Sequence, residues 1–259
     1  MYEQITSNSL LSKDKKIVSI QQRSLPQVKM EGVKLLGMWG SPFAIRAKMV
    51  LEHKGLSYQY LEEDLSNKSE LLLKHNPIYQ KVPVLIHGER GICESLVILE
   101  YIDENWSETG PSVLPASPYE RAIARFWAVY IDDKILPLVV GLINFANEET
   151  KAKHIANLHA AFEILEEAFK KCSAGKDFFG GDSIGYLDMT LGCYLAWIRA
   201  VERISEAKLL DETKVPLLAE WEKRILTVDC VKKALPSVEK LEVLGREMRA
   251  EGYQGSSAN

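Results

Sequence analysis

A break in the hydrophobic pattern at Glu108–Pro118 separates two parts of this chain that must fold differently. The stretch holds one glycine and three prolines in eleven residues, a composition unsuited to a helix interior or a central strand. Short strand-like runs alternate with helical patterns before it, and only helical periodicity follows it. We therefore predict an α/β domain at residues 30–109, a linker at 110–118 and an all-helical domain at 119–252.

The first part has the element order βαβ followed by ββα, which is the thioredoxin-like arrangement. The apolar runs VKLLGMW and VPVLIH are its clearest strands, SYQYLEED alternates as a further strand, and Ile92-Cys93 is a short one. Pro42 fits the first turn of a helix that stops at Gly55. The predicted helices of the whole chain are Pro42–Lys54, Ser69–His75, Ser95–Trp106, Tyr119–Asn147, Glu149–Cys172, Tyr186–Ile204, Val215–Thr227 and Ser237–Glu251.

The two ends of the chain lack this regularity. Residues 1–29 mix serine, glutamine and lysine with short apolar pieces, and they contain no signal-peptide core. Arg23 is their one arginine, fewer than an organelle presequence should carry. We predict a mostly disordered extension at residues 1–29 and a flexible tail at residues 253–259.

Composition removes several classes of function. The net charge of −4 gives no reason to expect nucleic acid as a partner, and no apolar run approaches the roughly 18 residues that span a membrane. The four cysteines are far apart and the five histidines form no HExxH pattern, so we expect no metal site. Unpaired thiols favour a reducing compartment, and we expect a cytoplasmic protein.

Pro83 interrupts an apolar run that should be a central strand. A proline there cannot donate to the ladder. Either the Val82-Pro83 bond is cis and turns the Val82 backbone outwards, where it could pair with a peptide-like ligand, or the proline is trans in an edge strand.

Glu94 and Ser95 stand where a strand end meets a helix start. The first amides of a helix form an anion site, Ser95 could cap the helix and bind a carboxylate, and Glu94 offers a negative charge for an ammonium. This suits the α-amino-acid end of a ligand, although a plain serine cap is the alternative. Lys68 and Lys81 could bind a carboxylate at the ligand's other end, or be solvated lysines.

Several ordered motifs together resemble one family. They are LLGMWGSPFAIR, YLEEDLSNKSELLLKHNP, KVPVLIHGERGICESLVILEYIDE, ERAIARFW and FFGGDSIGYLDMTLG, and they extend over almost the whole chain from Met30 to Gly252. In these motifs the chain resembles plant glutathione transferases of the tau class. The resemblance implies a thioredoxin-like domain followed by a helical domain, and glutathione as co-substrate with no other cofactor.

The resemblance also implies which residues bind glutathione. The γ-glutamyl end would meet Glu94 and Ser95, the cysteinyl backbone would pair with Val82, and the glycyl carboxylate would meet Lys68 and Lys81. The thiol would lie near Ser41 and its neighbour Phe43. The family usually has a basic residue before Lys81, where this chain has Gln80, and this could weaken glycyl binding slightly.

Ser41 is the predicted catalytic residue. It precedes Pro42 at a helix start, whose partial positive charge favours an anion. Its hydroxyl can donate a hydrogen bond to the thiolate, so it would stabilise the nucleophile that glutathione supplies. The alternative is that Ser41 is a helix cap and nothing more.

Two supporting features are predicted around this site. Arg46, one turn into the helix, could pair with Glu94 or with Asp132, or form an ordinary surface ion pair. Gly185 and Asp188 should form a capping box that serves folding. The electrophile should lie between the domains, and Val140 stands where the class often has a polar residue, so the pocket should favour apolar molecules. Its predicted walls are Met38, Trp39, Phe43, Tyr130, Leu136, Val140 and Trp197.

We therefore expect a cytoplasmic glutathione transferase, homodimeric as the resemblance implies, that conjugates small apolar electrophiles. Thiol transfer or dehydroascorbate reduction is a rival activity, but it would want a cysteine at position 41, where this chain has serine. Cys93 lies near the predicted glutathione site, and we expect it to be buried. A non-catalytic carrier of flavonoid-like or hormone-like molecules is a rival of another class, and peroxidase turnover could be a side activity.

Overall fold

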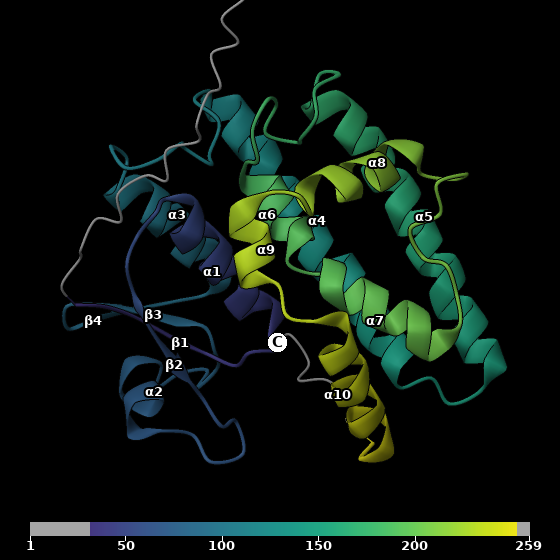
Figure 1. The fold of residues 1–259 in the computed structure, drawn as a ribbon, viewed down its shortest axis with the longest axis horizontal. Coiled ribbons are helices and arrows are strands. Elements are labelled where there is room, and N and C mark those ends of the chain that lie inside the picture. The colour runs from purple at the N-terminus through teal and green to yellow at the C-terminus, as the bar shows by residue number, and fades with distance from the viewer. Residues whose placement is uncertain (1–31, 253–259) are drawn as a thin grey trace, which may run out of the picture.

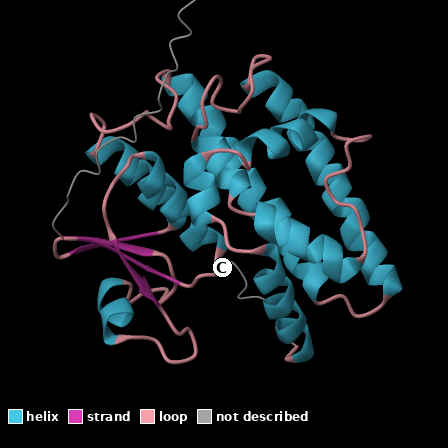
Figure 2. Ribbon diagram, viewed as in Figure 1, coloured by secondary structure: helices cyan, strands magenta, loops and turns pink. Residues whose placement is uncertain are grey.

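The computed structural model describes residues 32–252, and they form a small mixed sheet with helices beside a larger bundle of helices (Figures 1 and 2). The extension predicted at 1–29 and the tail predicted at 253–259 lie outside the described residues. The first part contains β1 (Val33–Gly37), α1 (Pro42–His53), β2 (Gln59–Glu62), α2 (Glu70–His75), β3 (Val84–His87), β4 (Arg90–Cys93) and α3 (Ser95–Asn105).

The sheet has the strand order β2-β1-β3-β4. β1 is parallel to β2 and antiparallel to β3, and β4 is antiparallel to β3. The βαβ and ββα halves predicted from the sequence are therefore present, and the thioredoxin-like arrangement is confirmed. β3 and β1 are central and buried, which matches their continuous apolar sequences.

The second part is helical throughout the described residues. Its helices are α4 (Pro118–Ile143), α5 (Glu148–Cys172), α6 (Tyr186–Gly192), α7 (Leu195–Ser205), α8 (Pro216–Ile225), α9 (Asp229–Ala234) and α10 (Val238–Ala250). None of the helices among residues 32–252 is long and apolar enough to cross a membrane.

One helix prediction was wrong, and one helix was not predicted. The single helix predicted at Tyr186–Ile204 is two helices, because the chain turns at Cys193 and Tyr194. Ile225 of α8 packs closely against Gly192, the last residue of α6, directly before this turn. A Cβ on Gly192 would lie 2.9 Å from the Ile225 side chain. The helix α9 was not predicted; it packs against α1 of the other domain.

The predicted linker is tied down by hydrogen bonds at its centre. Asp103 of α3 accepts hydrogen bonds from the Val113 and Leu114 amides and from the Ser112 hydroxyl. The same carboxylate forms a buried ion pair of 2.7 Å with Lys54, which follows the end of α1. One carboxylate therefore joins α1, α3 and the chain that leads into the helical domain.

The capping box predicted in the helical domain is confirmed. The Gly185 amide donates to the Asp188 carboxylate at 2.8 Å at the start of α6. Asp188 is fully buried and also accepts from the Phe179 and Gly180 amides and from the indole N–H of Trp221. It joins the start of α6 to the preceding loop and to α8, and its hydrogen bonds reach none of the predicted site residues.

Candidate active site

The strand register brings four separate segments to one edge of the sheet. Gly37 pairs with Glu62, Leu36 with Val84, and Val84 with Cys93. At this edge β1, β2 and β4 end and β3 begins, so the residues that follow or precede these strands must lie beside one another. The segments are 38–41, 63–69, 80–83 and 94–95, which carry the predicted residues Ser41, Lys68, Lys81, Val82, Glu94 and Ser95.

Ser41 is the N-cap of α1, as predicted. It is buried, its hydroxyl oxygen accepts from the Ala44 amide at 3.4 Å, and its carbonyl accepts from Ile45 at 3.0 Å. Its own amide donates to the Met38 carbonyl at 2.9 Å. The backbone groups of Ser41 are therefore committed to the turn and the helix, and the hydroxyl proton remains to be donated.

The Val82-Pro83 bond is cis, one of the two alternatives that the sequence left open. The amide and carbonyl of Val82 have no backbone partner within residues 32–252. Beside them, the Asn76 side chain donates to the Lys81 carbonyl at 2.9 Å and accepts from the Tyr79 amide. The loop before β3 is thus held in place while Val82 keeps its backbone groups open.

Glu94 has a positive φ of 70° directly after β4, a conformation that side chains other than glycine seldom adopt. Such conformations cost about 1–3 kcal/mol and gather at functional sites. The Glu94 side chain is exposed, so a ligand can reach it.

Ser95 does not cap α3, which corrects the prediction. It is the first residue of that helix, Glu94 is at the N-cap position, and no side chain caps the first turn. The Ser95 hydroxyl oxygen instead accepts from Arg46 at 2.8 Å. The first amides of α3 are therefore not used by a capping side chain and stay available to an anion.

Lys68 and Lys81 are both exposed at this edge, and neither forms an ion pair among the described residues. The loop that carries Lys68 is fixed by Glu63, which is buried and accepts from the amide and hydroxyl of Ser69. The two ammonium groups are free to meet an anion.

Arg46 pairs with Asp132 and not with Glu94, so one of its two predicted partners is correct. It is completely buried and binds both carboxylate oxygens of Asp132, at 2.5 and 2.9 Å. It also donates to Ser95 and to the Thr190 carbonyl. The alternative of a surface ion pair is excluded. One side chain therefore links α1, the start of α3 and two helices of the other domain.

Two predicted wall residues lie on one face of α4. Leu136 and Val140 follow Asp132 at intervals of four residues, so they continue the face that meets α1. Both are partly buried. Phe43 of α1 lies at the start of this face, with its ring edge-on to Tyr194 at 6.4 Å.

Tyr130 and Trp197 are both held by hydrogen bonds to backbone carbonyls, Tyr130 within the helical domain and Trp197 across to the first domain. The Tyr130 hydroxyl donates to the Ala161 carbonyl of α5 at 3.4 Å, so this side chain belongs to a different face of α4 from Asp132. Trp197 is buried, and its indole N–H donates to the Gly40 carbonyl at 2.7 Å. Trp197 is therefore enclosed where the two domains meet, and Tyr130 is partly buried between α4 and α5.

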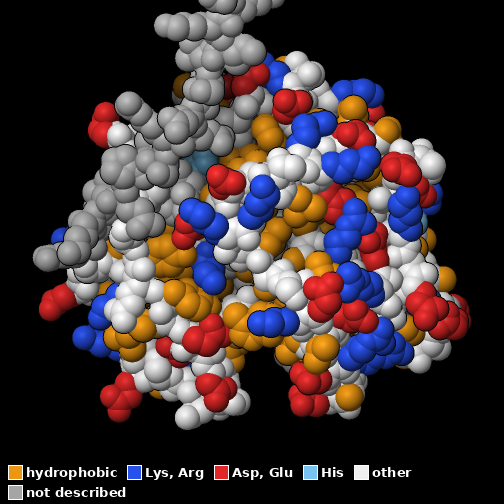
Figure 3. Space-filling view, in the orientation of Figure 1, with side chains coloured by type: hydrophobic (Ala, Val, Ile, Leu, Met, Phe, Trp, Pro, Cys, Tyr) orange, Lys and Arg blue, Asp and Glu red, His pale blue; other side chains and the backbone are white. Residues whose placement is uncertain are grey.

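The sequence prediction missed the contribution of α10. Trp39 and the Val243–Leu244 side of α10 border a groove of about 370 Å³, and a Cβ on Gly40 would lie 3.0 Å from Leu244. Figure 3 shows hydrophobic side chains where the domain that contains the sheet meets α10. The apolar spacing of Leu241, Leu244 and Met248 indicates a buried face of this helix. It does not indicate which element that face packs against.

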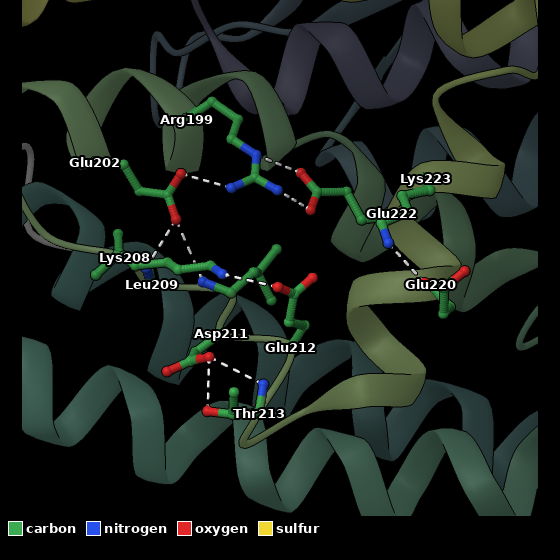
Figure 4. Close-up of polar contacts among 11 residues, drawn as sticks. Arg199, Glu202, Lys208, Leu209, Asp211, Glu212, Thr213, Glu220, Glu222 and Lys223 are labelled. Carbon is green, nitrogen blue, oxygen red and sulfur yellow. Dashed lines mark hydrogen bonds and ion pairs between the residues drawn. The ribbon is translucent and has the colours of Figure 1, made fainter.

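Other polar and hollow regions lie apart from this edge. A hollow of about 760 Å³ between the linker, the start of α4 and the end of α5 contains none of the predicted site residues. Arg199 bridges Glu202 and Glu222 between α7 and α8, and Glu202 also accepts from the Leu209 amide (Figure 4). No group of three or more His, Cys, Asp or Glu among residues 32–252 could hold a metal ion.

Comparison with known proteins gives the same family over both domains. The model of the glutathione S-transferase N-terminal domain matches residues 31–104, and the model of the C-terminal domain matches residues 148–224. Glutathione S-transferase U18 of Arabidopsis thaliana is 47% identical over 218 residues, 84% of this chain and 96% of the relative. Glutathione S-transferase U15 of the same plant is 49% identical over 212 residues, 82% of this chain and 91% of the relative.

Solved structures agree. The tau-class glutathione S-transferase of mango, Mangifera indica, superposes with a TM-score of 0.80 at 47% identity, covering 83% of this chain and 98% of the other. Rice GST1, solved in complex with glutathione, superposes with a TM-score of 0.78 at 36% identity, covering 85% of this chain and 96% of the other.

Proposed function

This chain belongs to the tau class of plant glutathione transferases, and from that premise we propose that Ser41 stabilises the thiolate of glutathione for attack on small apolar electrophiles. The observation that carries the proposal is the hydrogen bonding of Ser41. Its amide, carbonyl and hydroxyl oxygen are occupied within the turn and helix, which leaves one hydroxyl proton at a positively polarised helix start.

The energy required is within reach of this arrangement. A free thiol has a pKa near 8.5, so only a few per cent is thiolate at neutral pH. Lowering that pKa by about two units takes roughly 2.7 kcal/mol. A hydrogen bond to a charged group contributes about 1.5–3 kcal/mol, and the helix end adds to it.

The same edge of the sheet offers groups that would bind the rest of the glutathione molecule. Glu94 would receive the ammonium, and Ser95 with the uncapped amides of α3 would receive the α-carboxylate. The open amide and carbonyl of Val82 would pair with the cysteinyl backbone. Lys68 and Lys81 would meet the glycyl carboxylate, and Phe43 would lie beside the thiol.

The electrophile would lie between the domains, against the Leu136–Val140 face of α4 and the Trp39–α10 groove, with Met38 beside it. This lining is largely apolar and supports apolar electrophiles. Cys93 does not support thiol transfer, because burial, together with the neighbouring Glu94 charge, raises the pKa of its thiol.

The test is a titration of the bound thiol by its ultraviolet absorbance in the wild type and in Ser41→Ala. We expect the thiol pKa in Ser41→Ala to return to about 8.5, and conjugation of an aryl halide to fall by on the order of a hundredfold. Glutathione affinity should stay within a few-fold. The pH profile of kcat/KM should move upwards with the thiol pKa.

A matched control separates thiolate stabilisation from helix capping. Asn147 is the N-cap of α5 in the helical domain and accepts from Thr150 at 2.9 Å. Asn147→Ala loses a cap, as Ser41→Ala does, and should leave the thiol pKa unchanged. Equal thiol pKa values in the wild type and Ser41→Ala would mean that Ser41 is only a cap.

Carriage of flavonoid-like or hormone-like molecules is the second candidate, and the groove between Trp39 and α10 favours it. Tight binding of such molecules by a protein with no measurable turnover of aryl halides, isothiocyanates or organic hydroperoxides would support carriage over catalysis. Turnover of the hydroperoxides alone would indicate that peroxidase activity dominates.

We also propose a cytoplasmic homodimer. The four cysteines are all unpaired, which supports a reducing compartment.

The proposed dimer surface lies on α3 and α4. Arg46 binds both Ser95 of α3 and Asp132 of α4, and Glu100 of α3 pairs with Arg125 of α4, so the two helices run antiparallel. The exposed side chains of Val97 and Val129 lie between these two pairs of contacts along their helices. Phe126 beside them is also exposed. This apolar α3–α4 patch (Val97, Phe126 and Val129) is the surface that a second copy would cover.

A further inference from the structure

One hydrogen bond joins the helical domain to the backbone that carries Ser41. The indole N–H of Trp197, in α7, donates to the carbonyl oxygen of Gly40 at 2.7 Å. The Trp197 side chain is buried, so water does not compete for this contact. Gly40 is the residue directly before Ser41, and the two partners are 157 residues apart in the sequence.

This contact holds one end of the peptide unit between Gly40 and Ser41. The other end is the Ser41 amide, which donates to the Met38 carbonyl at 2.9 Å. A planar peptide with both polar groups held cannot rotate about its neighbouring bonds. Because the Ser41 side chain branches from the atom that follows this peptide, its direction is set in part by Trp197.

The indole is itself held by α10. A Cβ on Gly245 would lie 3.4 Å from the Trp197 ring and 2.7 Å from the Ile204 side chain, so only glycine lets α10 pack this closely. Leu244, the neighbouring residue, packs against Gly40. The tryptophan ring is therefore enclosed between α7, α10 and the Ser41 turn, and it has little room to change its orientation.

We propose that Trp197 is a positioning residue for the conjugation reaction, which acts through the Gly40 carbonyl on the direction of the Ser41 hydroxyl. The inference rests on the proposed role of Ser41. It assigns Trp197 no contact with glutathione or electrophile. A displacement of about 1 Å at a reacting group can cost a hundredfold in rate, so a contact that orients Ser41 can matter as much as one that touches the substrate.

The sharpest test removes only the N–H group. Replacing Trp197 by 3-benzothienylalanine keeps the size and shape of the ring and puts sulfur in place of the N–H. We expect kcat for an aryl halide to fall about tenfold and the pKa of bound thiol to rise, with KM for glutathione within twofold. Trp197→Phe should show the same pattern, and its folding is checked by thermal unfolding.

The same replacement at Trp127 is the matched control. Trp127 lies on α4 against Phe126 and Tyr130, and its indole N–H has no hydrogen-bond partner among residues 32–252. Its replacement by 3-benzothienylalanine should change neither kcat nor the thiol pKa. This control accounts for any general effect of the unnatural side chain.

A double-mutant cycle decides whether Trp197 acts through Ser41. In a Ser41→Ala background the replacement at Trp197 should have no further effect on the thiol pKa or on kcat. If it lowers kcat equally in both backgrounds, Trp197 acts independently of Ser41 and the inference is wrong. If Ser41→Ala shifts the thiol pKa and the Trp197 replacement does not, the proposed role of Ser41 stands and the inference alone fails. If Ser41→Ala itself shifts nothing, both fail together.

Discussion

At the scale of single residues, Arg46 shows how one side chain can serve folding and the site together. Burial opposes the charged form of Arg46, yet the neighbouring groups, among them the Asp132 carboxylate, hold its pKa above the ordinary value. The guanidinium is therefore charged at every physiological pH. It donates to the Ser95 hydroxyl at the start of α3 and makes no hydrogen bond to Glu94, so it holds one of the two residues proposed for the γ-glutamyl end of glutathione.

The first prediction concerns Glu94. Glu94→Ala should raise KM for glutathione by roughly tenfold or more, because a charge-assisted hydrogen bond to the ammonium is lost. Steady-state kinetics at varied glutathione concentration measures this. Glu89 is an exposed acid in the β3–β4 turn at the opposite edge of the sheet, and Glu89→Ala is the control that should leave KM unchanged. Equal KM values for a folded Glu94→Ala and the wild type would remove Glu94 from the site.

At the scale of elements, buried charges join helices that lie apart in the sequence. The Lys54–Asp103 pair closes the end of α1 onto α3 and the linker, and both side chains are almost fully buried. Although burial acts to raise the pKa of Asp103, hydrogen bonds from Lys54, Leu114 and Val113 leave it below its usual value. The carboxylate form thus stabilises the fold above its ordinary pKa near 3.8, and that contribution is lost as the pH falls through the lowered value.

The second prediction tests this pair. Lys54→Met should lower the free energy of unfolding by about 3–5 kcal/mol, because Asp103 keeps a buried charge without its ionic partner. Urea denaturation measures the change. The control is Lys176→Met, which breaks an exposed pair of 2.6 Å with Asp182 and should cost less than about 1 kcal/mol. A loss of similar size in both variants would show that burial does not decide the strength of the Lys54–Asp103 pair.

The third prediction concerns the face of α4 that continues from Asp132. Val140→Arg should lower kcat/KM for an apolar aryl halide about tenfold, since a charge would replace an apolar contact, and leave KM for glutathione unchanged. Ala156→Arg, an exposed position on α5, is the control and should alter neither constant. Unchanged kinetics in Val140→Arg would place the electrophile elsewhere, with the Trp39–α10 groove as the next surface to test.

At the scale of the whole molecule, helices of the helical domain pack beside the edge of the sheet that carries the predicted site residues. α1 packs against α6 and α9, and α10 reaches the turn that carries Ser41. In the function proposed above, the thioredoxin-like domain would supply the glutathione contacts, and the helical domain would supply the electrophile face and the support beneath Ser41. The exposed α3–α4 patch lies on a surface that neither domain covers in one copy.

The fourth prediction concerns that patch. Val129→Glu should shift the protein from dimer to monomer in analytical ultracentrifugation, because a charge would be buried in the apolar contact. Leu226→Glu changes another exposed apolar side chain, at the end of α8, and it should leave the dimer intact. A wild type that sediments as a monomer, or a dimeric Val129→Glu, would exclude this surface as the interface.

The sequence by itself determined the features that depend on neighbouring residues. The two-part division, the order βαβ and ββα, the Ser41 cap and the Gly185–Asp188 capping box follow from period, prolines and caps within a few residues. The same local information left Pro83 open between cis and trans, and it gave Arg46 two candidate partners.

Tertiary structure decided the contacts between residues far apart in the sequence. Arg46 and Asp132 are 86 residues apart, and Trp197 and Gly40 are 157 apart. In the sequence, Trp197 and Leu244 are apolar residues on predicted helices and nothing more specific. Periodicity shows which face of a helix is buried, but it does not show which element covers that face. Only the packing of α7 and α10 beside the sheet turned those faces towards the residue that carries the proposed chemistry.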